Sequence, residues 1–440
     1  MTKHRSSLMD HYVLTGSIPD YIDNDTSSPL LRYKPLTDWS DARYDKGVEP
    51  YSKYTSSAIA SSITAHGRKG DKYSGINFAS QDYLNLATHP EVLHTAKSAI
   101  DEYGVHSAGS AALMGSTIGS IQLEQRIAEF TGYKDCTLFP TGWSAGYGII
   151  RALTRPSDHI VIDVLSHACL HEGARAATNN VNLFPHLSMV GLEKRLKRIR
   201  QKDANNSIIV VVESLFSMDS DIPDLVKTQD LCNEYSATLI VDCAHDLGSI
   251  AETGRGALEF QSMIGKVDVL MGSFSKTFAS NGGFVATNAT ELKLGLKYLC
   301  GPNTFSNAMS PASAALVHKC FDIVESPEGK MLREKLLDNS KLLRSKLAEH
   351  DFEVIGEPSA IVPVVLGVNS VSRLATKYAL EHGGVVNLIE YPAVARGTSR
   401  WRLQVMAEHT NEQICEFVEI AVDAREYADS AAQKLDADAL

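Results

Sequence analysis

Short apolar runs alternate with helical stretches through the middle of this 440-residue chain. The runs are four to six residues long and nearly continuous, instead of alternating apolar with polar residues. Strands of this kind belong to a mostly parallel sheet that helices bury on both faces. The pattern therefore predicts an α/β fold. The expected strands are 136–139, 159–163, 208–213, 238–242, 267–271 and 283–287, and the expected helices include 120–131, 192–200 and 225–235.

The same pattern divides the chain into three parts. Residues 1–75 are polar with little periodicity, so we expect an N-terminal arm that packs on another surface, such as a partner subunit, with a helix over 59–66. Residues 76–310 form the large domain that holds the sheet. A smaller α+β domain is expected over 311–440, with helices at 313–325, 331–350 and 411–427, short strands at 361–366 and 401–406, and a frayed tail at 428–440.

Composition and charge exclude several classes of protein. The net charge of −11 argues against a nucleic-acid surface, because phosphate backbones are bound by basic patches. Residues 1–12 are polar, so we expect no signal peptide, and no apolar run approaches the roughly 18 residues that span a bilayer. The seven cysteines include no CxxC pair, which predicts neither a zinc site nor a disulfide framework. A reducing cytoplasmic location is expected.

Polar residues gather where the predicted strands end. In parallel sheets, ligands bind at the carboxyl ends of the strands, so these residues are the candidates for chemistry. They are Thr141, His167, Ser217, Asp242, His245 and Lys276.

Lys276 lies in the sequence SFSKTF, residues 273–278, directly after the predicted strand 267–271 and shortly before Gly282 and Gly283. A loop lysine flanked by hydroxyls is how proteins hold pyridoxal phosphate, since the amine forms a Schiff base with the cofactor aldehyde and hydroxyls bind the phosphate. A lone lysine is more often a solvated charge, but the buried strand before it disfavours that placement. Ser273 and Lys276 also match the S-x-x-K pattern of penicillin-recognising enzymes, whose SDN and KTG elements this chain lacks.

Asp242 ends the predicted strand 238–242 and precedes His245 by three positions. A carboxylate at a strand end commonly caps the following turn. A buried carboxylate, however, costs several kcal/mol unless it meets a cation, and a protonated pyridine nitrogen is such a cation. That pairing would make the cofactor ring an electron sink for a carbanion. His245 would then reach the phenolic oxygen of the cofactor.

Two further turns follow predicted strands. Gly142 and Trp143 open an expected helix, whose first N–H groups favour a phosphate, although Thr-Gly turns are frequent in α/β proteins. His167 is either a ring that stacks on the cofactor face or a satisfied buried histidine. His167 and His171 are four apart and could share a helix face as metal ligands, but no third ligand is evident, so no metal is expected.

Arg402 starts the expected strand 401–406, where an arginine suits bidentate capture of a substrate carboxylate. A solvated charge at a strand end is the plainer alternative for any single arginine. Arg400 lies two positions earlier, on the same face of a strand, and competes for either role.

Taken in order, these segments resemble the α-oxoamine synthases, a branch of fold-type I pyridoxal-phosphate enzymes. The resemblance covers residues 75–425 and implies a large domain with a mostly parallel sheet and a smaller C-terminal α+β domain. The segments that carry it are Asn77-Phe78-Ala79-Ser80-Gln81-Asp82-Tyr83-Leu84, Leu123-Glu124, Thr141-Gly142-Trp143, Ser166-His167-Ala168, Glu213-Ser214-Leu215-Phe216-Ser217-Met218-Asp219, Asp242-Cys243-Ala244-His245, Ser273 to Lys276, Gly282-Gly283, and Arg402 with His409-Thr410.

The resemblance implies a role for each matching residue. Lys276 would be the Schiff-base lysine and the base for the α-proton, and Asp242 would pair with the pyridine nitrogen. His167 would stack on the ring. Ser217 and His245 would contact the phenolic oxygen. Ser273, Gly142 and Trp143 would hold the phosphate region. Arg402 and Gln81 would bind the amino-acid substrate. Members are obligate dimers with the site at the interface, and Ser306 and Asn307 match positions that reach the phosphate of the partner.

The implied reaction is a decarboxylating Claisen condensation of a small amino acid with an acyl thioester of CoA or a carrier protein. It gives an α-amino ketone, and a homodimer is expected. The alternatives are another fold-type I reaction, such as transamination or elimination, and a non-catalytic partner subunit, against which the retained Lys276 argues. Gln81, Gly146, Ala111-Ala112 and Asn307 depart from residues common in the family, which bears on the substrate end of the site more than on the cofactor.

Overall fold

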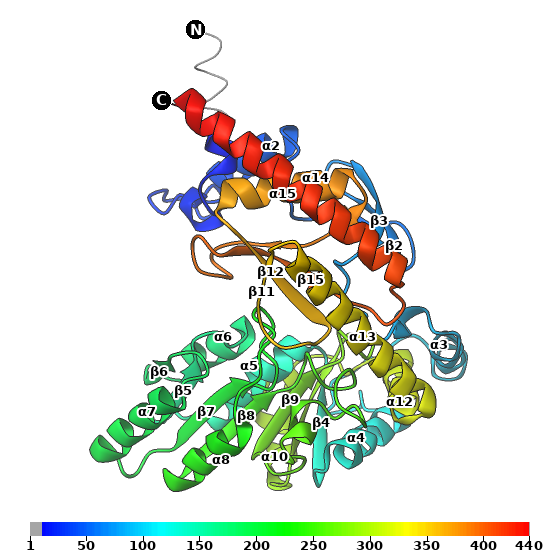
Figure 1. Cartoon of the computed structure of the whole chain (residues 1–440). Coiled ribbons are helices and arrows are strands. Elements are labelled where there is room, and N and C mark those ends of the chain that lie inside the picture. The colour runs from blue at the N-terminus through cyan, green and yellow to red at the C-terminus, as the bar shows by residue number, and fades with distance from the viewer. Residues whose placement is uncertain (1–10, 440) are drawn as a thin grey trace. The chain divides into compact units, whose positions relative to one another are not determined.

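The computed structural model describes residues 11–439, with side chains up to Lys434. The chain forms two compact units (Figure 1). The large unit is Gln81–Leu337, and the small unit joins the N-terminal residues up to Ser80 with those from Asp338 onward. The domain boundary was predicted at residue 310, whereas the large unit also includes helix α12 (Pro311–Glu325) and the first part of α13 (Pro327–Glu349).

A seven-stranded sheet forms the centre of the large unit, in the order β4-β10-β9-β8-β7-β5-β6. Only β10 runs antiparallel to its neighbours, so the carboxyl ends of the other strands meet at one edge. The mostly parallel sheet is as predicted, and β6 is the strand that the sequence pattern did not reveal. The bounds are β4 Asp135–Phe139, β5 His159–Asp163, β6 Val181–Phe184, β7 Ile208–Glu213, β8 Ala237–Asp242, β9 Val269–Ser273 and β10 Gly283–Thr287.

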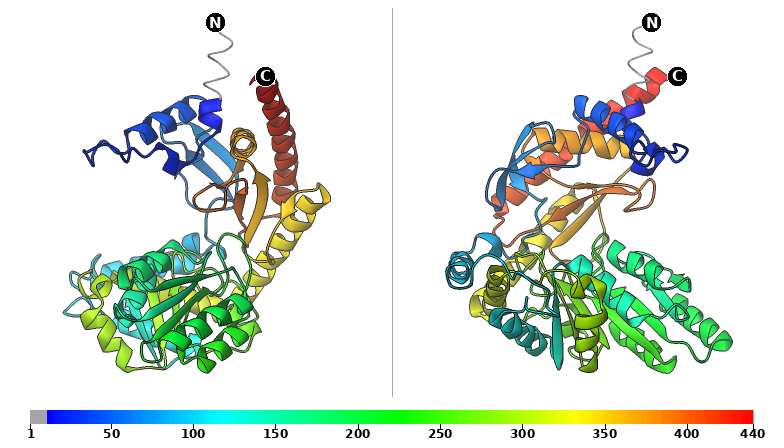
Figure 2. Two further views of the ribbon diagram at one scale, coloured as in Figure 1. Left: turned by 90° about the vertical axis from the view of Figure 1, so that its left-hand side faces the viewer. Right: turned by 180° about the vertical axis from the view of Figure 1, so that it is seen from behind.

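Helices bury the sheet from both faces, as Figures 1 and 2 show. Alternate strand residues, such as Ile160, Ile209 and Ile240, pack with Ile149 and Leu170 of helices α5 and α6 in one apolar core. The strands are therefore continuously apolar because each face has a helical cover. The helices of this unit are α3 Pro90–Tyr103, α4 Ile118–Thr131, α5 Gly142–Leu153, α6 Ala168–Ala177, α7 Met189–Lys202, α8 Leu225–Glu234, α9 Ala257–Phe260, α10 Glu291–Leu299, α11 Gly301–Thr304, α12 and the first part of α13 Pro327–Glu349.

In the described residues, the small unit holds two four-stranded sheets, the helices α2, α14 and α15, and the second part of α13. One sheet has the order β1-β2-β3-β13 and the other β11-β12-β15-β14. Among the described residues, no helix of either unit has the length and apolar character to cross a membrane. The bounds are β1 Tyr54–Thr55, β2 Ser62–His66, β3 Lys72–Asn77, β11 Glu353–Val354, β12 Ile361–Gly367, β13 Gly384–Val385, β14 Leu388–Ile389, β15 Ser399–Gln404, α2 Lys34–Asp45, α14 Asn369–Glu381 and α15 Asn411–Ala439.

Two predictions for the small unit were wrong. Residues 59–66 contain strand β2 instead of a helix, because burial alternates along Ser62–His66 and the strand pairs with β3. The tail from 428 was expected to fray, but α15 continues to Ala439. Ala428 is fully buried, so packing anchors the helix at the first residue of the stretch that was expected to fray.

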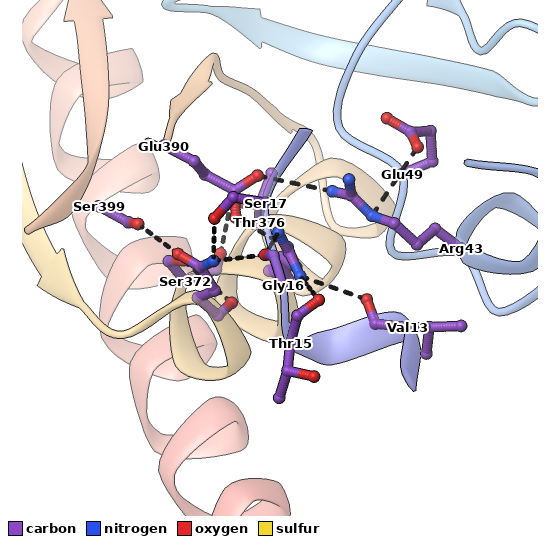
Figure 3. Close-up of polar contacts among 12 residues, drawn as sticks. Val13, Thr15, Gly16, Ser17, Arg43, Glu49, Ser372, Thr376, Glu390 and Ser399 are labelled. Carbon is purple, nitrogen blue, oxygen red and sulfur yellow. Dashed lines mark hydrogen bonds and ion pairs between the residues drawn. The ribbon is translucent and has the colours of Figure 1, made fainter. Parts of the chain in front are cut away.

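A buried ionic cluster attaches the N-terminal residues to α14 (Figure 3). The Arg373 guanidinium donates to the carbonyls of Thr15 and Gly16 at 3.0 and 2.9 Å, and its Nε lies 2.7 Å from the Glu390 carboxylate. Arg43 lies 3.6 Å from the second oxygen of Glu390. The expected N-terminal arm therefore packs on the C-terminal part of its own chain.

Candidate active site

A cavity of about 220 Å³ opens at the carboxyl edge of the large sheet. Neighbouring strands each deliver residues to it, since parallel strands end side by side. His167 follows β5, Glu213 ends β7, Asp242 ends β8 and Lys276 follows β9. The full lining is Thr141, Gly142, Trp143, His167, Cys169, Glu213, Asp242, Ala244, His245, Met271, Ser273, Ser275, Lys276 and Asn281.

One side of the cavity is the start of helix α5. Thr141 caps this helix through a reciprocal pair of hydrogen bonds with Ser144, which fixes the first turn. A Cβ on Gly142 would lie 2.4 Å from the Cβ and Oγ of Ser273, so only glycine lets the helix start approach the end of β9 this closely. The hydroxyls of Ser273 and Ser275 lie 3.1 Å apart at the same place. Helix N–H groups and hydroxyls together suit a phosphate.

Asp242 is a buried carboxyl, 6% exposed. Its Oδ1 accepts the backbone N–H of Ala244 at 2.9 Å. Burial raises the pKa of Asp242, and the nearby Lys276 and His167 oppose that rise. A carboxyl in this setting is stabilised as the anion by a further cation, such as a pyridinium nitrogen.

The two histidines of the site are held by hydrogen bonds. His167 is the N-cap of α6, and its Nδ1 lies 3.0 Å from the Cys169 Sγ and 3.3 Å from the backbone nitrogen of Cys169. The Nδ1 of His245 is hydrogen-bonded to the Tyr83 hydroxyl at 2.9 Å. Both rings therefore have defined orientations at the cavity. The sequence analysis did not predict that Cys169 and Tyr83 would orient these two histidine rings.

Glu213 is a further lining residue to which sequence reasoning gave no role, although it opens the quoted motif 213–219. The carboxyl is 2% exposed. Burial, and then Asp242, raise the pKa of Glu213 well above its usual range. A glutamate directly after five apolar strand residues was the available signal, since such a residue must either end in solvent or face a site.

Several predicted site residues are not among those that line the cavity in the described part of the chain. Ser217 is buried in the loop after β7, and Gln81 is the first residue of the large unit. Asn307 forms an isolated bridge with Ser110, next to Ser306. Arg402 belongs to the small unit, where it lies buried on β15 together with Arg400.

A different group of side chains has the spacing of metal ligands. Within residues 11–434 this group is His186, Asp219 and Asp221, and it includes neither His167 nor His171. Both ring nitrogens of His186 already lie 2.9 Å from carboxylates, those of Asp163 and Asp221. The arrangement is that of a histidine between two acids.

Comparison with known proteins decides the family. The family model described as aminotransferase class I and II matches residues 73–420. The chain is 32% identical to 2-amino-3-ketobutyrate coenzyme A ligase of Salmonella typhimurium, over 88% of this chain and 96% of that protein. It is 36% identical to 8-amino-7-oxononanoate synthase of Citrifermentans bemidjiense, over 75% of this chain and 84% of that protein. The chain belongs to the α-oxoamine synthases.

A solved structure has the same fold as this synthase over most of the chain. It is a serine palmitoyltransferase from S. paucimobilis with bound PLP, with a TM-score of 0.85 at 27% identity, covering 92% of the synthase and all of that chain. The synthase is thus a fold-type I, pyridoxal-phosphate-dependent acyltransferase that condenses an amino acid with an acyl thioester with loss of CO₂. The predicted family, fold, cofactor and reaction class are confirmed.

The residues of the cavity fit pyridoxal phosphate. The close approach at Gly142 leaves a helix start and two serine hydroxyls for the phosphate, and Asp242 is a buried carboxyl in need of a cation. Lys276 lines the same cavity. An amine, an anion site and a buried acid are the three groups that this cofactor requires.

Proposed function

We propose that the enzyme joins a small α-amino acid to an acyl-CoA or acyl-carrier thioester, giving an α-amino ketone, CO₂ and the free thiol. One observation supports this most: Lys276, Asp242 and His167 line one cavity at the carboxyl edge of the sheet, beside the start of α5. A carbanion at the amino-acid α-carbon attacks the thioester carbonyl, and the thiolate leaves and takes a proton. The carboxyl group then departs as CO₂, and the α-carbon takes up a proton from solvent in its place.

The residues divide between holding the cofactor and moving a proton. Pyridoxal phosphate, when bound, supplies the electron sink that stabilises a carbanion at the substrate α-carbon. The Nζ of Lys276 would hold the cofactor, and it is the amine at the cavity that would take the α-proton. The Asp242 carboxylate keeps the pyridine nitrogen protonated, because a proton between them is stabilised by the buried negative charge.

The remaining residues orient the reacting groups. His167, whose Nδ1 is held by Cys169, would stack against the ring. His245, held by Tyr83, and Ser217 would contact the phenolic oxygen. Ser273, Gly142 and Trp143 would bind the phosphate. Arg402 would bind the substrate carboxylate, with Gln81 also on the substrate side.

The test uses the purified holoenzyme with a panel of amino acids and acyl-CoA chain lengths. We expect free thiol and CO₂ to appear in equal amounts with a small amino acid. Formation of an oxo acid without either product would point to transamination instead.

The matched variants are Lys276→Ala and Lys266→Ala, of which the second removes an exposed lysine. We expect Lys276→Ala to lower turnover at least about a thousandfold, since a positioned base alone contributes 10²–10⁴-fold. Lys266→Ala should behave as the natural enzyme. Normal turnover by Lys276→Ala would contradict the assignment.

We further propose a homodimer in which Ser306 and Asn307 reach the phosphate of the partner. Ser107 Oγ donates to the Ala308 carbonyl at 2.8 Å, and Asn307 Nδ2 lies 3.1 Å from His106 Nε2. The segment around 106–107 and the segment around 307–308 therefore form one surface. That surface carries apolar side chains in water: Leu113, Met114 and Phe305 are 85%, 91% and 89% exposed. Large exposed apolar groups of this kind mark interaction sites.

The proposed location is the cytoplasm. All seven cysteines of the chain are unpaired, and six of them are buried. Unpaired buried cysteines are usual in proteins of a reducing compartment.

A further inference from the structure

Asp246 is a buried carboxyl that the roles above leave unused. It comes directly after His245, none of it is exposed, and it does not line the cavity. Its Oδ1 accepts the Ser214 hydroxyl at 2.7 Å, and its Oδ2 accepts the backbone N–H of Ala257, also at 2.7 Å. Burial raises the pKa of Asp246 to about 6, so the group is ionised at pH 7 and above. A buried carboxylate is unfavourable unless hydrogen bonds compensate it, so its place behind the site needs a physical explanation.

Ser214 connects this carboxylate to the end of strand β8. Ser214 is fully buried and follows the last residue of β7. Its backbone N–H donates to the Asp242 carbonyl at 2.8 Å, and its Oγ lies 3.1 Å from the same carbonyl oxygen and 2.7 Å from Asp246 Oδ1. A hydroxyl has one proton to donate, and it goes to the nearer, charged acceptor. Asp246 therefore fixes Ser214, and Ser214 in turn fixes the backbone of Asp242.

The second oxygen of Asp246 fixes the loop that carries His245. Ala257, whose N–H this oxygen accepts, is the first residue of α9. Gly256 approaches so closely that a Cβ there would lie 2.4 Å from the same oxygen, and its φ of +70° is one that glycine adopts readily. The carboxylate is thus held by Ser214 at one oxygen and by residues 256–257 at the other. Because Asp246 is fixed in this way, so is the position of the residue before it, His245, which lines the cavity.

We propose that Asp246 is a positioning residue that fixes Asp242 through Ser214, and His245 through the chain itself, so that carboxylate and imidazole meet the cofactor from set places. The inference rests on the roles proposed above for Asp242 and His245. Asp246 lies outside the cavity lining, so it can act on the cofactor only through these neighbours. Its removal should therefore change how tightly, and in which orientation, pyridoxal phosphate binds.

Three variants separate this role from general stability. Asp246→Leu keeps the size of the side chain but removes both acceptors. We expect it to raise the dissociation constant of pyridoxal phosphate about tenfold, as loss of an orienting partner behind a metal ligand does. Ser214→Ala removes only the connecting hydroxyl and should raise this constant about threefold, the effect of one hydrogen bond. Asp246→Asn should bind the cofactor as the natural protein does, because its amide oxygen still accepts from Ala257 and its NH₂ group donates to Ser214 Oγ.

The measurements are titration of the apoprotein with pyridoxal phosphate and the visible circular dichroism of the bound cofactor, which reports its orientation. When Asp246→Leu and Ser214→Ala are combined, we expect a rise in the dissociation constant smaller than the product of the two single effects, because both act through one connection.

Asp158→Leu is the matched control. Asp158 is a buried carboxyl that accepts the N–H groups of Arg155 and Ser207, precedes β5 at the amino end of that strand, and does not line the cavity. This variant should lower thermal stability and leave cofactor affinity and dichroism unchanged.

The outcomes are distinguishable. If the natural protein binds no pyridoxal phosphate, the proposed function fails. If it binds the cofactor and Asp246→Leu binds equally tightly with the same dichroism, only the role of Asp246 is overturned. An equal loss of affinity in Asp158→Leu would also overturn that role, because the effect would then be one of stability. If Asp246→Leu does not fold, Ser214→Ala decides, and unchanged affinity and dichroism in that variant would overturn the connection to Asp242.

Discussion

At the scale of single residues, Gly142 is a position where the close packing of the backbone leaves no room for a side chain. A side chain there would collide with Ser273, and the Cβ of a residue at Gly283 would in turn lie 2.8 Å from the Gly142 Cα. Two backbones and a serine thus meet at the start of α5. The spacing of the proposed phosphate site depends on this contact more than on any charged side chain.

Gly142→Ala should separate α5 from β9 and weaken the binding of pyridoxal phosphate about tenfold or more. We expect the free energy of unfolding of the apoprotein to fall by about 1–3 kcal/mol, the usual cost of overpacking. Denaturant unfolding and cofactor titration measure the two effects. Gly295→Ala on α10 is the control, since a Cβ there meets nothing within 4 Å, and it should leave both unchanged or slightly raise stability.

Arg402 and Arg400 compete for the substrate carboxylate. Arg400 Nε donates to the Thr398 carbonyl at 3.2 Å, a contact typical of a strand end. We therefore expect Arg402→Ala to raise the amino-acid dissociation constant about a hundredfold, since a charge-assisted pair contributes about 2–3 kcal/mol. Arg400→Ala should change it much less. Spectroscopic titration of the holoenzyme decides, and an unchanged constant in Arg402→Ala would transfer the role to Arg400.

At the scale of elements, hydrogen bonds between side chains connect the segments at the carboxyl ends of neighbouring strands. Asp163 ends β5, His186 follows β6 and Asp221 lies in the loop after β7. The two ring nitrogens of His186 are hydrogen-bonded to Asp163 and Asp221, so this histidine connects the ends of the three strands. Burial alone would lower the pKa of His186, but the hydrogen bonds and charges of the two carboxylates outweigh burial and raise that pKa to about 10.

This raised pKa predicts how stability depends on pH. Between about pH 6.5 and 10 the folded protein binds a proton at His186 that the unfolded chain does not. The stabilisation is therefore complete below pH 6.5 and lost as the pH rises through 10. We expect His186→Gln to lower the melting temperature at pH 6 and to differ progressively less from the natural protein toward pH 10.

Thermal melts at several pH values measure the difference in melting temperature between His186→Gln and the natural protein. Because the other titrating groups are the same in both proteins, their effects cancel in this difference. His94→Gln, an exposed histidine on α3, is the control and should follow the natural protein at every pH. A gap between His186→Gln and the natural protein that stays constant across this range would argue against a charged His186.

At the scale of the whole molecule, the proposed dimer has a defined surface. Phe305 and Met114 are exposed on neighbouring segments of the large unit. A stable interface buries roughly 1,200–2,000 Å² and is centred on such apolar anchors. The same segments hold Ser306 and Asn307, so loss of the dimer and loss of cofactor affinity are expected together.

Phe305→Glu should therefore shift the protein toward the monomer in light scattering and weaken pyridoxal phosphate binding in parallel. Val190→Glu is the control, since Val190 is exposed on α7. It should remain dimeric. A natural protein that is monomeric at micromolar concentration would contradict the proposed dimer, and a dimeric Phe305→Glu would contradict this surface.

Much of the fold and cofactor site was predictable because the patterns involved are local. Continuous apolar runs such as 208–213 predicted the parallel sheet, and the ordered motifs around Asp242 and Lys276 predicted the family and cofactor. Such signals depend on residues a few positions apart. The same kind of signal failed at 59–66, where pairing of β2 with β3 overrode the helical interpretation.

The sequence by itself determined the layer order, the cofactor and the class of reaction, since each follows from short motifs and strand ends. Only the tertiary structure decided which side chains meet. It placed Glu213 beside Asp242 through strand register, and it set Gly142 against Ser273 across more than a hundred residues of chain. It also buried Ala428 on α15, inside the stretch that was expected to fray. Register and burial arise from contacts between distant segments, which no local pattern encodes.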